Sequence, residues 1–318
     1  MKKFFAITGN LLAETTMTFD MPAVGATARA LAPAGFQVGG KGVNASKAIS
    51  AISRALPKSG VKAYSVIFPA GANGERCMDF LREKKFCQTI SERVSGETRM
   101  GLVCVDAKTG VETTFLGDGI PIGIGAFKRA LKKISSKAAP GDILALCGSF
   151  PGWSARHAQE LRKLRLSKNL IFCADTYGAP LRDAANMKCD LLKINRREFF
   201  AHLARTCDNG SFKAFKNAFE KTAKRLNAVY FAVSDGENPA LFKESGRETF
   251  LIEPPRAETV SSTGCGDIMF ACMAYELFFA NTAFKLAAAR AVKWASLEAG
   301  KRGICSLTCA EIARILKK

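Results

Sequence analysis

The sequence has few histidines and no cysteine spacing typical of a metal or redox site. It contains two histidines among 318 residues, and none of its eleven cysteines forms a C-x-x-C pair. Zinc fingers and thioredoxin-like redox motifs both need such pairs. Cys104, Cys147 and Cys173 lie inside apolar runs, where a thiol packs as a small hydrophobic group. We therefore expect reduced cysteines and a cytoplasmic location.

Long apolar runs are also missing. No uncharged stretch approaches the length of a membrane-spanning helix. The segment Met1–Thr8 starts with a basic region, as a signal peptide does, but Gly9 and Asn10 interrupt its apolar part and Glu14 follows. We interpret this segment as a first β-strand and expect no membrane partner.

Acidic residues are scarce relative to basic ones. The chain has 47 Lys and Arg against 28 Asp and Glu, which gives a net charge of +19. A basic surface attracts anions, such as nucleic acids, acidic lipids or phosphorylated metabolites. The densest basic clusters are Arg129–Lys133 and Arg162–Lys168, and no basic run is interleaved with aromatic residues. We expect capture of small anionic ligands and no specific nucleic-acid partner.

Short apolar segments alternate with helical patterns along most of the chain, which is typical of a parallel sheet covered by helices. The predicted strands are Phe4–Thr8, Ala63–Phe68, Ile143–Cys147, Leu170–Ala174, Asp190–Ile194 and Val229–Ser234. The predicted helices are Val43–Leu56, Gly74–Glu83, Ala126–Ser135, Ser154–Leu164 and Phe212–Leu226, followed by a largely helical stretch over Ile268–Leu316. No repeat or linker divides the chain, so we predict one α/β domain over residues 1–318.

Two segments, at about 13–37 and 97–117, interrupt this alternation. Both contain strand and turn patterns without helices. Within the second, Val103–Asp106 and Val111–Phe115 are predicted to form a hairpin around Lys108–Gly110. Two such insertions predict a small second sheet that serves as a lid or as an oligomer contact.

The segment Val260–Asp267 reads V-S-S-T-G-C-G-D and precedes an apolar helical run. Gly264 and Gly266 allow a sharp turn that presents backbone N–H groups at a helix N-terminus, where anions bind. Beside them, Asp267 could accept a proton from an alcohol while the N–H groups, including that of Cys265, stabilise a transferring phosphoryl group. The alternative is an ordinary glycine turn with an aspartate in the first helical turn.

A second glycine-rich segment, G-G-K-G-V-N, covers residues 39–44. Gly39 and Gly40 allow close approach of a ligand, Lys41 supplies a positive charge, and Asn44 can bond two hydroxyls at once. The alternative is a flexible turn that leaves Lys41 in solvent.

A third motif, K-I-N-R-R-E, follows a predicted strand at residues 193–198. Asn195 and Glu198 have the spacing of a helix capping box, which is a purely structural interpretation. The functional interpretation places Glu198 near a Mg²⁺–phosphate complex, with the contact made through water.

Together these motifs resemble the signatures of the PfkB-type, ribokinase-like carbohydrate kinases. Residues 39–44 and 261–267 resemble the paired signatures of the family, and residues 193–198 resemble its N-x-x-E element. The branch that includes 1-phosphofructokinase and tagatose-6-phosphate kinase is most similar. Its further motifs are similar to Asn10–Glu14, Gly96–Arg99, Gly148–Gly152, Asp175–Gly178 and Val233–Gly236. The resemblance therefore covers nearly the whole chain in order.

The resemblance implies a three-layer α/β/α core with a mostly parallel central sheet, and a small β-sheet lid built from the two insertions. It implies ATP- and Mg²⁺-dependent phosphorylation of a hydroxyl on a phosphorylated hexose, first of all fructose 1-phosphate to fructose 1,6-bisphosphate. Tagatose 6-phosphate, fructose 6-phosphate or another small sugar remain alternative acceptors. A sugar-phosphate- or nucleotide-binding regulatory protein is the alternative that is not an enzyme. A homodimer through the lid segments is a further implication.

The resemblance also implies roles for individual residues. Asp267 would be the catalytic base, and the backbone of Gly264, Cys265 and Gly266 the anion hole. The sugar would be held by Glu14, Gly39, Gly40, Lys41, Asn44, Ser149 and Arg99, the last on the phosphate that the sugar already carries. The nucleotide would contact Lys193, Asn195, Ser234, Gly236, Ser262 and Gly264, and Glu198 would organise Mg²⁺ through water. Arg29 is a looser match to a second phosphate ligand.

Four sites depart from the family pattern. Leu11 replaces the proline that follows Asn10. Glu14 stands in place of an aspartate, so its carboxylate reaches about one methylene further and hydroxyl selection is expected to change. Glu237–Pro239 replaces a second glycine of the nucleotide loop. Cys265 replaces an alanine, which we expect to matter little because the anion hole uses backbone N–H groups.

Overall fold

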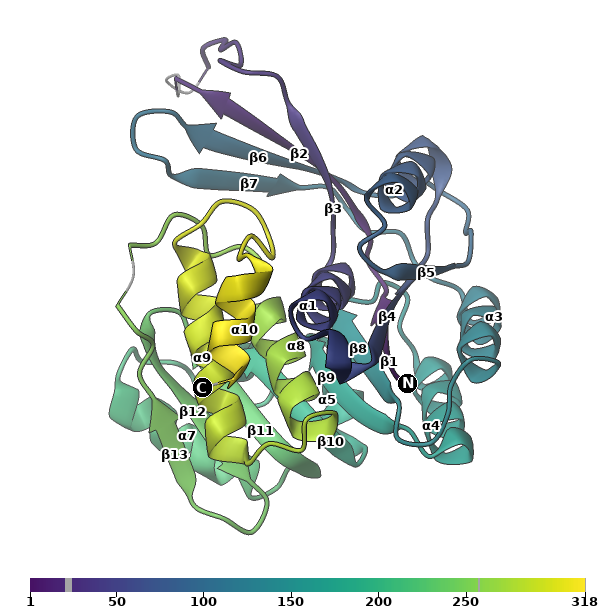
Figure 1. Cartoon of the computed structure of the whole chain (residues 1–318), viewed down its shortest axis with the longest axis vertical. Helices are drawn as coiled ribbons and strands as arrows, with labels where there is room; N and C mark the ends of the chain where they lie inside the picture. The colour runs from purple at the N-terminus through teal and green to yellow at the C-terminus, as the bar shows by residue number, and fades with distance from the viewer. Residues whose placement is uncertain (21–24, 257, 318) are drawn as a thin grey trace.

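The computed structural model describes residues 1–20, 25–256 and 258–317. Within them the strands form a nine-stranded sheet and a separate four-stranded sheet. Figure 1 shows the four-stranded sheet standing off the helix-covered main body. The predicted fold class, a mostly parallel sheet between helices with a small second sheet, is confirmed. The assignment of the whole chain to one domain stays a prediction.

The central sheet contains all six strands predicted from the sequence. Across the sheet its strands are β13 (Thr249–Ile252), β12 (Asn238–Glu244), β11 (Ala228–Asp235), β10 (Cys189–Asn195), β9 (Ile171–Thr176), β8 (Ile143–Gly148), β1 (Lys2–Thr8), β4 (Val61–Ile67) and β5 (Gln88–Ser91). Neighbours from β11 to β5 pair in parallel, and β12 and β13 extend the sheet in antiparallel fashion. The strands β5, β12 and β13 were not predicted.

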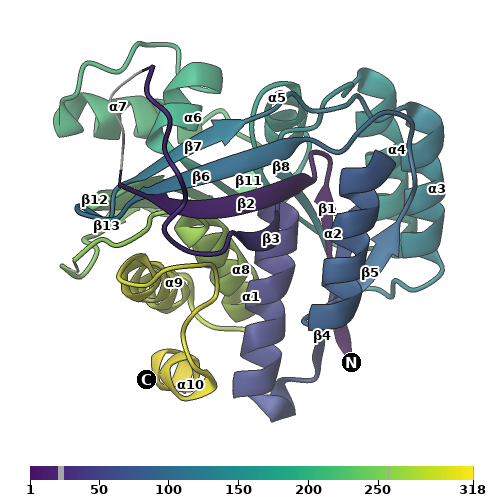
Figure 2. The same cartoon turned by 90° about the horizontal axis from the view of Figure 1, so that it is seen from above.

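Helices cover both faces of this sheet, as Figure 2 shows from above. One layer contains α1 (Lys41–Ala55), α8 (Cys265–Phe278), α9 (Phe284–Ala299) and α10 (Cys309–Lys317). The other contains α3 (Ile124–Ser135), α4 (Ala155–Lys168), α5 (Ala179–Asn186), α6 (Arg196–His202) and α7 (Phe212–Ala223). The predicted helices are confirmed, and a 3₁₀ turn, η1 (Pro57–Ser59), follows α1. No helix of the described residues is long and apolar enough to cross a membrane.

Successive residues of the central strands face opposite helix layers, because side chains alternate along a strand. In β1, Phe4 and Ala6 belong to the apolar cluster that includes α1, α8 and α9. Phe5 and Ile7 belong to the cluster that includes α3, α4 and α7. All four side chains are buried. Burial on both faces, which is typical of parallel sheets, therefore holds the sheet between its two helix layers.

The second sheet, here called the lid, has the strand order β3 (Gly35–Gly39), β2 (Leu12–Phe19), β6 (Met100–Asp106) and β7 (Glu112–Leu116). The predicted hairpin is present, since β6 and β7 pair in antiparallel fashion and the Gly110 N–H donates to the Asp106 carbonyl at 2.8 Å. Helix α2 (Gly71–Lys84) packs against β2 and β3. The lid thus combines two chain segments that are far apart in sequence.

The carboxyl ends of the parallel strands meet at one edge of the central sheet. Residues 9–11 connect β1 to β2, so the lid is attached at this same edge. Ligands of open α/β sheets bind in the crevice outside the carboxyl ends of the strands. The fold therefore places any site between this edge and the lid.

Candidate functional site

A cleft of about 1220 Å³ lies between the lid and the carboxyl edge of the central sheet. Every residue that the motifs assigned to the site lines this cleft, with the exceptions of Glu198 and the loosely matched Arg29. Those lining it are Glu14, Gly39, Gly40, Lys41, Asn44, Arg99, Ser149, Lys193, Asn195, Ser234, Gly236, Ser262, Gly264, Cys265, Gly266 and Asp267. Arg29 is exposed and is not among the lining residues.

Asp267 lies in the first turn of α8, with its carboxylate 7% exposed. Asn44 of α1 donates its Nδ2–H to Asp267 Oδ2 at 2.7 Å. Burial, reinforced by the negative charge of Asp175, raises the pKa of Asp267 to about 7, although Lys41 and Asn44 act in the opposite direction. A carboxylate with a pKa near neutrality is suited to accept a proton in a reaction at neutral pH.

The two glycines ahead of Asp267 are required by their surroundings. Gly264, the N-cap of α8, has φ of 79°, and a Cβ there would lie 2.9 Å from Ile304. A Cβ on Gly266 would lie 2.7 Å from Nζ of Lys193. The turn therefore presents bare backbone at the N-terminus of α8, next to a lysine, which is an arrangement that favours anions.

A buried ion-pair network lies behind this turn. Lys41 Nζ is 2.7 Å from Asp175 Oδ1 and 2.8 Å from Glu198 Oε1, and Lys193 Nζ is 3.3 Å from Asp175 Oδ2. Burial opposes the charge of Asp175, but Lys193 and Lys41 together hold its pKa below its usual value. Burial likewise acts against the charge of Lys41, yet Asp175 and Glu198 raise its pKa.

Lys41 is therefore not a solvent-exposed turn residue. Two of the three ammonium donors are directed to carboxylates, so one donor remains for the cleft. Its ammonium also lies 5.9 Å from the centre of the Tyr177 ring, which lines the cleft. The sequence singled out neither Asp175 nor Tyr177 as a site residue, although both belong to the D-T-Y-G segment that follows a buried strand.

The capping box predicted for residues 195–198 is present. Asn195 Oδ1 accepts from the Glu198 N–H at 2.8 Å, and Glu198 Oε2 accepts from the Asn195 N–H at 3.1 Å. The other oxygen, Oε1, is bonded to Lys41. The structural interpretation of this motif is thus confirmed. Glu198 also contacts the ion-pair network through Lys41, and its functional interpretation stays a prediction.

The end of the cleft next to the lid carries a carboxylate and a guanidinium. Glu14 of β2 is buried and accepts from Gln37 Nε2. Burial raises the pKa of Glu14, Gln37 lowers it, and the negative charge of Glu112 raises it further. Arg99 has a buried Nε without a partner among the described residues, and burial lowers its pKa. An unpaired, buried guanidinium N–H is a ready donor to an anionic ligand.

An arginine that was not predicted holds the loop at residues 234–236, which also lines the cleft. Arg196 donates to both carboxylate oxygens of Asp208, at 2.8 and 2.6 Å, and to Asp235 at 2.9 Å. Asp235 stands between the predicted site residues Ser234 and Gly236. A bidentate contact of this kind fixes orientation as well as distance, so Arg196 connects the 195–198 element to the 234–236 loop.

Comparison with known proteins gives a consistent result. Residues 12–310 match the family model described as pfkB family carbohydrate kinase. A 1-phosphofructokinase of Rhodobacter capsulatus is 29% identical over 237 residues, which cover 73% of this chain and 71% of that protein. A 1-phosphofructokinase of Xanthomonas campestris pv. campestris is 25% identical over 277 residues, with 85% and 83% covered. The fold is similar to that of phosphofructokinase-2 from Escherichia coli, with a TM-score of 0.85, 19% identity and complete coverage of both chains.

The raised pKa of Asp267 predicts a stability difference that depends on pH. The usual pKa of this carboxyl group is 3.8, and its pKa in the folded chain is about 7. Between these pH values the folded chain keeps a proton that the unfolded chain has released, so the free energy of unfolding falls as pH rises through this window. Asp267→Asn has no such proton to release, so its stability does not fall in this window. Its free energy of unfolding should exceed that of the wild type at pH 8 by on the order of a few kcal/mol, and the two free energies should be equal near pH 3. Urea unfolding at pH 4.5, 6 and 8 measures the difference, and a constant offset across these values would contradict the assigned shift.

Proposed function

Because this chain belongs to the pfkB family of carbohydrate kinases, we propose that it transfers the γ-phosphoryl group of ATP to a hydroxyl of fructose 1-phosphate. The product would be fructose 1,6-bisphosphate. The observation that carries the proposal is Asp267, which is buried in the first helical turn beside the glycine backbone of residues 264–266. The names of the two curated relatives support fructose 1-phosphate as the acceptor.

In the proposed mechanism, Asp267 accepts the proton of the acceptor hydroxyl as that oxygen attacks the phosphoryl group. Asn44 orients the carboxylate through its hydrogen bond to Oδ2. The backbone N–H groups of residues 264–266 stabilise the charge on the transferring group, since preorganised donors at a helix N-terminus act without reorganisation. The lid and the carboxyl edge of the central sheet hold the two reactants together in one cleft.

The residues around the glycine turn at 264–266 fit a nucleotide with its magnesium ion. The glycine turn leaves space for phosphate oxygens against bare backbone, and Lys193 lies against Gly266. No cluster of three or more potential metal ligands occurs in residues 1–20, 25–256 or 258–317. Mg²⁺ is usually bound through phosphates and water, and we propose Glu198 as its contact through water. When bound, the ion would offset charge on the phosphates.

The acceptor end fits a sugar that already carries a phosphate. We propose that Arg99, with its unpartnered Nε, binds this phosphate, and that Glu14 binds a hydroxyl. Ser149 is fixed by Asn10, whose Nδ2 lies 2.9 Å from Ser149 Oγ, and would bind a further hydroxyl. Lys41 would contribute its remaining donor near the phosphoryl group in transfer.

Turnover by the purified protein tests this proposal directly. ATP consumption with Mg²⁺ should be highest with fructose 1-phosphate in a panel that includes tagatose 6-phosphate, fructose 6-phosphate and the free sugars. Asp267→Ala should lower kcat by about 10²–10⁴-fold while nucleotide binding is kept, because only proton transfer is lost. Asp79→Ala, at an exposed carboxylate on α2, is the matched control.

Near-normal turnover in Asp267→Ala would overturn the base assignment. Highest activity on another phosphorylated hexose would change the acceptor and keep the mechanism. Nucleotide binding without turnover on any sugar would favour a regulatory binding protein.

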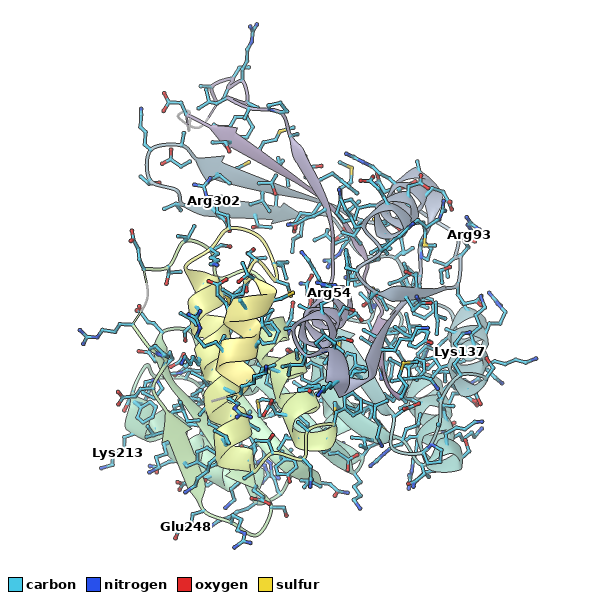
Figure 3. The ribbon with its side chains drawn as sticks, viewed as in Figure 1. Arg54, Arg93, Lys137, Lys213, Glu248 and Arg302 are labelled. Atoms are coloured by element: carbon cyan, nitrogen blue, oxygen red, sulfur yellow. The ribbon has the colours of Figure 1, made fainter. Side chains whose placement is uncertain are left out.

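Arg99 should distinguish a phosphorylated acceptor from a free sugar. Loss of a charge-assisted hydrogen bond in Arg99→Ala should raise KM for fructose 1-phosphate by about 10–100-fold, with a smaller change in kcat. Arg93→Ala is the control, since Arg93 forms an exposed ion pair with Glu75 and lies at the periphery of the molecule, away from the lid (Figure 3). An unchanged KM in Arg99→Ala would remove Arg99 from the acceptor site.

We also propose a homodimer that pairs through the outer face of the lid. Phe115 lies opposite Leu102 in the β6–β7 ladder, and Met100, two residues before Leu102, points to the same face. Met100 and Phe115 are 58% and 59% exposed. Apolar side chains gathered on an exposed sheet face are typical of a protein contact.

Sedimentation velocity tests the dimer. The wild type should sediment as a dimer, and the double substitution Met100→Asp and Phe115→Asp should sediment as a monomer, because two buried carboxylates without partners are costly at an interface. Leu166→Asp, at an exposed leucine of α4, should leave the dimer intact. A wild type that is monomeric at micromolar concentration would refute the proposal.

A further inference from the structure

The lid contacts the loop that precedes α8 through a hydrogen bond between residues 149 positions apart. Ser261 Oγ donates to Oε2 of Glu112 on β7 at 2.8 Å. Ser261 is 6% exposed and Glu112 is partly buried. The hydrogen bond is partly buried and joins a hydroxyl to a carboxylate, and hydrogen bonds to ionised groups are stronger than those between neutral groups.

The tip of the β6–β7 hairpin lies close to the loop between α9 and α10. A Cβ added to Gly110 would lie 3.8 Å from Nη2 of Arg302. Figure 3 shows Arg302 between the lid and the end of the helical body. The hairpin tip therefore lies near the body of the molecule, on the side where Ser261 bonds Glu112.

Ser261 also shapes the anion-binding turn itself. Its Oγ accepts from the Thr263 N–H at 3.3 Å, one residue before Gly264. Its own N–H donates to the Ala299 carbonyl at 3.0 Å, as does that of Val260 at 2.7 Å. One hydroxyl thus accepts from the turn and donates to the lid, so the orientation of the turn and the position of β7 are linked through a single oxygen.

We propose that Glu112 is a positioning residue for phosphoryl transfer, whose hydrogen bond to Ser261 links closure of the lid over the acceptor to the geometry of the anion-binding turn. The inference rests on the proposed function. Glu112 itself does not line the cleft; it reaches the site through its hydrogen bond to Ser261 and through the effect of its charge on Glu14, and Glu112→Gln separates the two because it removes the charge and keeps an acceptor oxygen. Neighbouring residues of the same strand, Thr114 and Leu116, do line the cleft, so a shift of β7 changes the cleft wall.

The link has a kinetic consequence. If the acceptor binds to the closed lid, its apparent affinity falls in proportion to the closed fraction. Breaking the hydrogen bond lowers that fraction, and acceptor binding itself restores closure at saturation. We therefore expect a change mainly in KM for the acceptor.

Three variants test the inference. Glu112→Ala removes the acceptor group, Glu112→Gln keeps an oxygen that can accept from Ser261, and Glu248→Ala removes an exposed carboxylate between β12 and β13, far from the lid (Figure 3). Glu112→Ala should raise KM for the sugar phosphate about tenfold, with kcat changed less than about threefold. Glu112→Gln should restore KM to within about threefold of the wild type, and Glu248→Ala should match the wild type.

Amide hydrogen exchange gives a readout that needs neither substrate nor turnover. Exchange at Thr263 and Gly264 and along β7 should be about tenfold faster in Glu112→Ala than in the wild type, and unchanged in Glu248→Ala. Unchanged exchange in Glu112→Ala, or a Glu112→Gln variant as impaired as Glu112→Ala, would overturn the inference. If no sugar phosphate is turned over by the wild type but exchange responds as expected, the proposed function fails and the lid contact stands.

Discussion

The buried carboxylate of Asp175 is the group on which the geometry of the cleft depends. It lies one residue before the end of β9, is 1% exposed, and accepts from Lys41 at the start of α1 and from Lys193 in β10. A buried ion pair is sustained only where its geometry and hydrogen bonds compensate for desolvation. Removal of this carboxylate would leave Lys193 buried without its ion-pair partner. Asp175 therefore holds three elements in one arrangement at the edge where the ligands are expected.

The same network explains why Asp267 is a usable base. Burial and the charge of Asp175 both favour the protonated form of Asp267, whereas Lys41, Asn44 and Lys193 favour the carboxylate. A fully buried carboxyl group without cations nearby would stay protonated at neutral pH. The balance leaves its pKa at about 7, where the carboxylate is both present and basic enough to accept a proton.

The features that were predictable from the sequence are those whose signal is local. Strands that are largely buried, such as β1 and β8, contain apolar runs that can be recognised without knowledge of the neighbouring strands. The glycines beside Asp267 likewise lie within a few residues of it. The antiparallel strand β12 contains Pro239, and the edge strand β5 has only four residues, so neither has a clear pattern. Contacts between Lys41 and Asp175, or between Glu112 and Ser261, join residues 134 and 149 positions apart and emerge only from the fold.

The lid carries carboxylates beside a cleft that is proposed to bind anions. The hydrogen-bond partners of these carboxylates show how they are held there. Glu14 is bonded to Gln37 and Glu112 to Ser261, both neutral groups that hold a carboxylate without cancelling its charge. Arg99 is the lid-side cation of the cleft and keeps a buried N–H without a partner. In the proposed function, an acceptor would direct its anionic group toward Arg99 and a hydroxyl toward Glu14, because the reverse orientation would set like charges together. Charge at the lid would thus select the orientation of the acceptor before any contact with Asp267 is made.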